Sequence, residues 1–243
     1  MNKNMMKQNN SISTGFAELD KCLKGMRGGE LLLVGGRPAM GKTSFALNIV
    51  NHLTVGKDVP CLYYTLENTK EYVEEKLKRI GGDETYERLA VSADLPLYIE
   101  DENSISMDDF CTIVREHKKK HNIEFVVIDY IQLLVERQTF HRDISDLKKL
   151  AVELDIPIMM LSQISRDAEK RDDKRPIISD SVFFEAIQPQ VDVIMFIYRD
   201  AYYNCDTEKP NTAEIIIAKN NNEEIETVEL GFVEGRYFDQ TEC

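Results

Sequence analysis

Eight consecutive residues near the start of the chain have the types and the spacing needed to hold a chain of phosphates. They match the pattern G-x-x-x-x-G-K-[ST] at every fixed position, and they are Gly36, Arg37, Pro38, Ala39, Met40, Gly41, Lys42 and Thr43. In this pattern the backbone N–H groups of the loop and of the helix that follows, starting with Ser44, surround the phosphates. Lys42 is expected to reach the β- and γ-phosphates, and the Thr43 hydroxyl to complete the shell of a bound Mg²⁺. The sequence therefore predicts a site for a nucleoside triphosphate with Mg²⁺.

The segments on either side of this loop match the structure that the pattern requires. Residues 31–34 form an apolar run typical of a buried strand, and residues 44–50 repeat their apolar side chains at helical spacing. Upstream, residues 17–23 place apolar side chains on one helical face, and Gly28 with Gly29 turns the chain into the strand. A chance glycine-rich turn is the alternative, and the strand and helix beside the loop argue against it.

Two acidic residues follow predicted strands and could take part in phosphate chemistry. Asp129 ends the apolar run 125–128, where a carboxylate would hold the metal; a helix or turn cap is the alternative. Glu67 ends the run 63–66 and could orient the attacking water, or lie solvated near a helix N-terminus. Both positions fit the edge at which the carboxyl ends of parallel strands meet.

Polar side chains after two further strands could contact the nucleotide. Gln163 comes just past the apolar run 158–161, where its amide could hydrogen-bond the γ-phosphate. Arg199 could stack on the nucleotide base, or pack at the edge of the sheet, together with Tyr198, Tyr202 and Tyr203.

Apolar runs alternate with helical patterns along most of the chain. Short runs typical of buried strands recur at 61–66, 97–99, 125–128, 158–161 and 193–197. Helical patterns lie between them at 69–81, 106–121 and 142–154. This alternation predicts an α/β fold with a mostly parallel central sheet flanked by helices.

The last third of the chain has a different pattern. Two strand-like runs, 213–218 and 226–230, have no helix between them and predict a C-terminal antiparallel hairpin. Two polar segments, 166–182 and 200–212, have the composition of loops, and we expect them to be the mobile parts of the chain.

The bulk properties of the chain are those of one acidic domain. Its 243 residues suffice for one full core, which we place at residues 13–243 behind a polar tail, residues 1–12. Acidic residues outnumber basic ones by 43 to 30, and the net charge of -13 disfavours non-specific binding to nucleic acid. The five cysteines lack C-x-x-C spacing, which fits a reducing cytosol better than a disulfide framework or a zinc site. Since no apolar run approaches the ~20 residues of a membrane span, we expect a cytoplasmic protein with no membrane partner.

Seven short segments occur in an order that is far more specific than the phosphate loop alone. In chain order they read T-G-F-A-E-L-D, G-R-P-A-M-G-K-T, T-L-E, V-V-I-D-Y-I-Q-L-L, L-S-Q-I-S-R, F-I-Y-R-D-A-Y-Y-N and I-I-I-A-K. Over residues 13–238 the chain resembles the C-terminal motor domain of DnaB-type replicative DNA helicases. The resemblance implies a RecA-type P-loop NTPase fold, ATP hydrolysis coupled to translocation on DNA or to its unwinding in replication, and assembly into a ring.

The same resemblance implies roles for individual residues. Glu67 would be the catalytic glutamate, and Asp129 with residues 130–134 the second nucleotide motif. Gln163 would sense the γ-phosphate, and Lys219 would reach the nucleotide of the neighbouring subunit in the ring.

The chain departs from the family pattern where the family couples ATP to DNA. The family has an arginine finger two residues after the position of Lys219, and this chain has Asn221 there. Since a trans arginine accelerates hydrolysis about 10³- to 10⁵-fold, we expect weak activity unless Arg199 or Arg236 substitutes for it. The family's DNA-contacting Arg-Glu-Ser-Gly is replaced by Val-Phe-Phe-Glu at 182–185, which exchanges charge for apolar surface.

Three interpretations follow. The first is a DnaB-like helicase domain with weakened activity, bound to single-stranded DNA in a ring of its own copies or of mixed helicase-like subunits. The second is a hydrolysis-poor regulatory module in which residues 182–184 dock a protein. The third is a recombinase-like or clock-type ATPase, since those relatives share T-G-F-A-E-L-D. A short loop at 136–142 and the expected lack of the family's primase-binding N-terminal domain weaken the expectations of DNA binding and of a ring.

Overall fold

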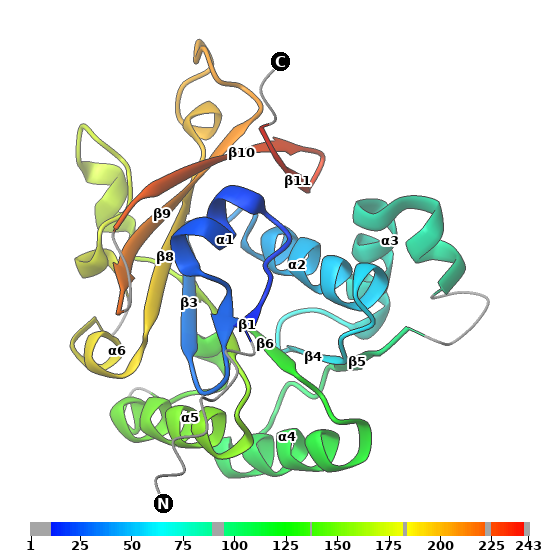
Figure 1. Ribbon diagram of the computed structural model, residues 1–243. Coiled ribbons are helices and arrows are strands. Elements are labelled where there is room, and N and C mark those ends of the chain that lie inside the picture. Colours follow the sequence, from blue (N-terminus) through cyan, green and yellow to red (C-terminus); the bar gives the residue numbers. More distant parts are fainter. Residues whose placement is uncertain (1–10, 89–94, 137, 182–183, 222–224, 241–243) are drawn as a thin grey trace, which may run out of the picture.

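A nine-stranded sheet organises the chain, and helices cover both of its faces (Figure 1). The computed structural model describes residues 11–88, 95–136, 138–181, 184–221 and 225–240. Within these residues the strand order is β11-β10-β9-β8-β3-β7-β6-β4-β5. The sheet is parallel from β8 to β5 and antiparallel from β8 to β11, as the sequence predicts.

The parallel strands coincide with the predicted apolar runs. They are β3 (Leu31–Gly36), β4 (Cys61–Thr65), β5 (Leu97–Glu100), β6 (Phe125–Asp129), β7 (Ile158–Gln163) and β8 (Val193–Tyr198). Every residue of β3, β4, β6 and β8 is buried, because helices cover both faces of the sheet. The carboxyl ends of the strands meet at one edge, where Gly36 pairs with Gln163 and Thr65 with Asp129.

Two hydrophobic cores lie on opposite faces of the sheet. Leu32 and Val34 of β3 join one core, and Leu31 and Leu33 join the other, as the two-residue period of a strand requires. The first core packs under α1 (Ala17–Leu23), α2 (Lys42–Gly56) and α3 (Lys70–Glu87). The second packs under α4 (Met107–His121), α5 (Phe140–Leu154) and α6 (Phe184–Gln190).

The C-terminal hairpin is present and is extended by a strand that the sequence did not predict. Strands β9 (Thr212–Asn220) and β10 (Thr227–Val233) pair antiparallel, and β11 (Arg236–Asp239) pairs with β10. Glu234 and Gly235 form the tight turn between them, with φ of 51° and 88°. Because β11 has only four residues, its apolar pattern is too short to recognise in the sequence.

Strand β11 attaches the end of the described chain to the helix that follows the phosphate loop. The Tyr237 ring lies edge-on to Phe45 of α2 with centroids 5.4 Å apart, and Phe45 stacks on Phe16 at 5.6 Å. Such aromatic contacts add to the stabilisation from burial alone. The last strand of the sheet is therefore part of the same core as the first helices.

Short elements that are absent from the sequence predictions occur in the connecting segments. The segment 166–182 contains the 3-10 helices η3 (Arg166–Lys170) and η4 (Ile178–Asp180), and the segment 200–212 contains η5 (Asp200–Tyr202). Helix α6 and the pair β1 (Ser11–Ile12) with β2 (Met26–Arg27) were also not predicted. These pieces have two to seven residues, fewer than a periodic pattern needs. Among the described residues, no helix is both long and apolar enough to cross a bilayer.

Candidate nucleotide site

The phosphate loop joins the end of β3 to the start of α2, as predicted. Gly41 precedes α2 with φ of 102°, and a Cβ atom there would come within 2.5 Å of the Tyr237 hydroxyl. Both its backbone conformation and this close approach require glycine at position 41. The Tyr237 hydroxyl donates to the carbonyl oxygens of Met40 and Gly41 at 3.4 and 3.3 Å. Strand β11 thus supports the phosphate loop through the hydroxyl of Tyr237.

Lys42 is the first residue of α2, and its side chain turns back over the phosphate loop. Its Nζ donates to the carbonyl oxygens of Gly36 at 3.0 Å and of Arg37 at 3.2 Å. Burial lowers the pKa of Lys42 to about 8, while the nearby carboxylates of Asp129 and Glu67 act in the opposite direction. A partly buried ammonium group in this position can attract a phosphate chain more strongly than a solvated lysine can.

Thr43 and Asp129 lie in contact, although 86 positions separate them. The Thr43 hydroxyl donates to Asp129 Oδ2 at 2.9 Å, and the Tyr63 hydroxyl donates to the same oxygen at 2.7 Å. Burial raises the pKa of Asp129, and the two hydrogen bonds act to lower it. A hydroxyl beside a carboxylate is a donor set that suits Mg²⁺. These two residues are therefore placed to hold the metal that the phosphate pattern implies.

Glu67 and Gln163 occupy the same edge of the sheet. The N–H of Leu66 donates to the carbonyl oxygen of Asp129 at 2.8 Å, which holds the chain before Glu67 beside the end of β6. Glu67 is exposed and interacts electrostatically with Lys42. Gln163 is the last residue of β7 and pairs with Gly36. The structure thus brings both residues to the phosphate loop.

The other residues of the loop differ in their environments. The Arg37 side chain, 12 % exposed, donates from Nε to Glu169 at 2.9 Å and from Nη1 to the carbonyl oxygen of Ile164 at 3.0 Å. Arg37 therefore ties the loop to the segment after β7. Pro38 and Ala39 are exposed, whereas Met40 and Ser44 are buried.

Arg199 reaches over the phosphate loop from the end of β8. Its guanidinium carbon lies 4.1 Å from the centroid of the Phe232 ring, and its Nη1 lies 3.4 Å from the carbonyl oxygen of Ala39. Phe232 belongs to β10, and it was not predicted as a site residue because an aromatic residue in a strand usually belongs to the core. An arginine and an aromatic ring beside a phosphate loop form a surface on which a base can stack.

Lys219 lies at the opposite end of the sheet from the phosphate loop, where the parallel strands begin. It pairs with Ile194 near the start of β8, and its Nζ donates to the carbonyl oxygens of Gln188 and Val191 at 2.6 and 2.5 Å. Asn221, two residues later, donates from Nδ2 to Asp192 at 3.2 Å. Of the predicted catalytic residues, Lys219 alone is not brought to the phosphate loop of its own chain.

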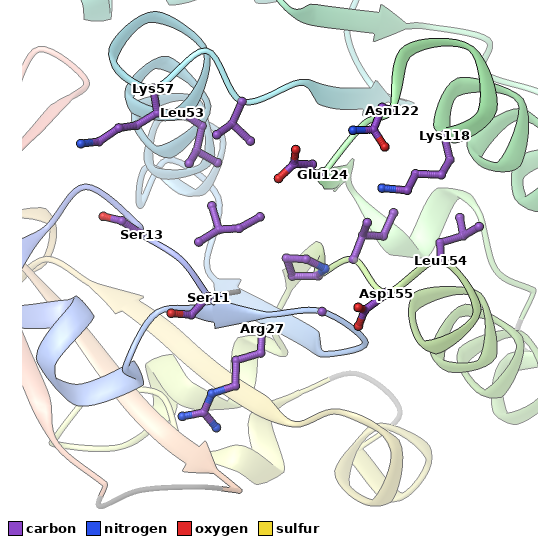
Figure 2. Close-up of a pocket in the computed structure, with 15 residues that line it drawn as sticks. Ser11, Ser13, Arg27, Leu53, Lys57, Lys118, Asn122, Glu124, Leu154 and Asp155 are labelled. Carbon is purple, nitrogen blue, oxygen red and sulfur yellow. The ribbon is translucent and has the colours of Figure 1, made fainter. Parts of the chain in front are cut away.

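A cavity of about 980 Å³ lies at this same end of the sheet, where the parallel strands begin (Figure 2). Its described lining includes no predicted site residue. The walls come from the β1–β2 pair and from the ends of α2, α4 and α5, with residues such as Lys57, Asn122 and Asp155. Cavity size therefore does not locate the candidate nucleotide site in this protein.

Comparison with known proteins identifies the family of the chain. The family model described as "DnaB-like helicase C terminal domain" matches residues 11–239. The replicative DNA helicase DnaB of Geobacillus stearothermophilus is 34% identical over 247 residues, which cover 91% of this chain and 54% of that protein. The chain therefore spans about half the length of this relative.

Solved structures give the same fold. One of them, described as an ATPase domain, superimposes with a TM-score of 0.87 and 28% identity, covering 98% of this chain and 94% of that one. A KaiC-like protein from Pyrococcus horikoshii has a TM-score of 0.70 at 16% identity and covers 95% of this chain and 99% of that one, which supports the RecA-like fold alone. The predicted family is confirmed: this chain belongs to the DnaB-like helicase C-terminal domain family.

Proposed function

We propose that this chain binds ATP with Mg²⁺ and hydrolyses it as the motor domain of a DnaB-like helicase. The observation that carries the proposal is the 2.9 Å contact between Thr43 and the buried carboxylate of Asp129, directly beside Lys42. This set supplies a cation for the phosphates and two oxygen ligands for the metal. When bound, Mg²⁺ would neutralise charge that develops on the phosphates.

Each of the remaining site residues would then have one role in the hydrolysis of ATP. Glu67, exposed and close enough to Lys42 for electrostatic interaction, accepts the proton of the attacking water. Gln163 donates from its amide to the γ-phosphate. Lys42 exchanges the carbonyl oxygens of Gly36 and Arg37 for phosphate oxygens, which are stronger acceptors.

We propose that Arg199 and Phe232 hold the base, since they lie over the loop that would hold the phosphates. Stacking on a base is typically worth about 1–3 kcal/mol. The Arg199→Ala variant should therefore bind ATP about 5- to 10-fold more weakly, as measured by titration calorimetry. Arg79→Ala is the matched control, because this exposed arginine lies on α3 and has no proposed role at the nucleotide. Equal weakening in both variants would contradict the base contact.

Turnover should be slow in the absence of a partner. Asn221 offers an amide where the family has an arginine, and it is hydrogen-bonded to Asp192 of its own chain. Lys219 is held by two carbonyl oxygens and must leave them before it can reach a neighbouring subunit. Mixing the protein with a full-length DnaB-type helicase should raise its hydrolysis rate if the neighbour supplies the finger in a mixed ring.

Binding of single-stranded DNA separates the helicase from the alternative, a hydrolysis-poor regulatory module. A translocase that contacts about four phosphates should lose DNA affinity roughly 50-fold between 50 and 200 mM salt. We expect this salt dependence in fluorescence anisotropy with a labelled oligonucleotide. Affinity that does not change with salt would favour the regulatory module, which is motivated by Asn221 and by the apolar residues 182–184. Of these, residues 182 and 183 lie outside the described part of the chain.

A further inference from the structure

The side chain of Gln132 joins the two motifs that would hold the metal and sense the γ-phosphate. Gln132 lies in the 3-10 helix η2 (Ile131–Leu133), three residues after Asp129. Its Nε2 donates to Ser162 Oγ at 2.8 Å and to the carbonyl oxygen of Gln163 at 3.0 Å. Its Oε1 accepts from the N–H of Gln163 at 3.4 Å. One carboxamide therefore holds the last two residues of β7.

The side chain of Gln132 lies where the backbone pairing between β6 and β7 has ended and the last residues of β7 need another partner. The pairing of β6 with β7 ends at Ile128 and Met160, and β6 then turns away into η2. The backbone of Gln163 would lack a partner on that side, although on the other side it pairs with Gly36. A carboxamide carries the donor and the acceptor of a peptide group, so Gln132 continues the ladder to the end of β7.

Gln132 has no N–H group left to donate to a phosphate. Its two N–H groups donate to Ser162 and Gln163 and its oxygen accepts from Gln163, so an effect on phosphate chemistry would pass through these two residues, of which Gln163 pairs with the phosphate loop strand. The backbone of Gln163 is held by Gly36 of β3 on one side and by Gln132 of η2 on the other. Its side chain can keep one direction toward a γ-phosphate only while this backbone is held in place.

We propose that Gln132 is the positioning residue for the γ-phosphate sensor Gln163, and that through it the protein distinguishes ATP from ADP. The inference rests on the proposed nucleotide site. It adds a residue whose hydrogen bonds connect the segment after the metal carboxylate, Asp129, to the sensor.

The test compares two nucleotides that differ in the γ-phosphate. Gln132→Met keeps the length of the side chain and removes both hydrogen-bonding groups. We expect its Kd for AMP-PNP with Mg²⁺ to rise about 5- to 10-fold, as for the loss of one typical hydrogen bond. The Kd for ADP should change less than about 2-fold, and kcat for ATP should fall about 10- to 100-fold because a displaced group loses alignment. Titration calorimetry and a coupled ATPase assay give these values.

A double-mutant cycle separates positioning from a general structural role. If Gln132 acts through Gln163, Gln132→Met should have little further effect on kcat in a Gln163→Ala protein. Gln138→Met, which applies the same change to an exposed glutamine, is the control and should leave every value unchanged. Additive losses in the double variant, or equal weakening of ADP and AMP-PNP, would overturn the proposal.

A second variant keeps the proposal testable if Gln132→Met does not fold. Gln132→Glu keeps the acceptor for the N–H of Gln163 and replaces the donor to its carbonyl oxygen with negative charge, so it should also weaken AMP-PNP more than ADP. If the wild-type protein binds neither nucleotide, the proposed nucleotide site fails and this inference fails with it. If the wild type binds both and the variants match it, only the role of Gln132 is wrong.

Discussion

Replacing Glu67 with glutamine should reduce ATP turnover about 10²- to 10⁴-fold and leave nucleotide affinity nearly unchanged. The amide keeps the shape of the side chain and loses the ability to accept a proton from water, and general base catalysis typically contributes this much to a rate. Glu67 is exposed and lies just after β4, whose last residue, Thr65, pairs with Asp129, so the exchange should not disturb the core. Steady-state hydrolysis with Mg²⁺ gives kcat, and calorimetry with ADP gives the affinity.

The control for this variant is Glu71→Gln, which makes the same change at an exposed position in the first turn of α3. It should hydrolyse ATP at the wild-type rate. Wild-type turnover in Glu67→Gln would show that another group takes the proton. Measured with and without single-stranded DNA, the same assay also tests the motor: tight ATP binding without turnover in the wild type would favour the regulatory module.

Replacing Lys42 with alanine should weaken the binding of ATP about 10- to 100-fold. The lysine would make charge-assisted hydrogen bonds to phosphate, each typically worth about 1.5–3 kcal/mol. The change also leaves the carbonyl oxygens of Gly36 and Arg37 without their donor, so the thermal midpoint must be measured alongside affinity. Lys57→Ala, at the far end of the same helix, is the control and should bind ATP normally.

The pKa of Lys42 should make the affinity for ATP depend on pH. In the folded protein without nucleotide that pKa is about 8, below the ordinary value of 10.5, because burial disfavours the charge. ATP requires the charged form, so its affinity should fall as pH rises through about 8 in the wild type and less steeply in Lys42→Ala. The unfolded chain binds more protons between about pH 8 and 10.5, so the folded state gains stability from this group as pH rises over that range. An identical pH profile in wild type and Lys42→Ala would contradict the assignment.

The parts of the site that were predictable from sequence are those fixed by local spacing. The eight-residue phosphate pattern places Lys42 and Thr43 at the start of a helix wherever it occurs between a strand and a helix. Asp129 and Glu67 could be found because each directly follows an apolar run, and Gln163 because it lies two residues past one. Parallel strands place their carboxyl ends together. Because this rule holds for every parallel strand, the residues that gather at the site could be predicted without knowing the order of the strands in the sheet.

The residues that sequence reasoning missed act through contacts between distant strands. Tyr63 is in an apolar run and reads as a core residue, yet its hydroxyl reaches Asp129 from the neighbouring strand. Phe232 and Tyr237 reach the phosphate loop through the pairing of β10 with β11. Gln132 takes its role from the point at which β6 and β7 separate. Such register details depend on which strands become neighbours, and no local pattern encodes them.

The support that Tyr237 gives to the phosphate loop sets an order of events during synthesis. The tyrosine follows Met40, whose carbonyl oxygen accepts its hydrogen bond, by 197 residues. At a translation rate of about 5–20 residues per second, the ribosome needs roughly 10–40 s to make that stretch. The loop therefore leaves the ribosome long before the strand that supports it. In a nascent chain the phosphate loop should therefore reach its final, supported arrangement only after Tyr237 has left the ribosome.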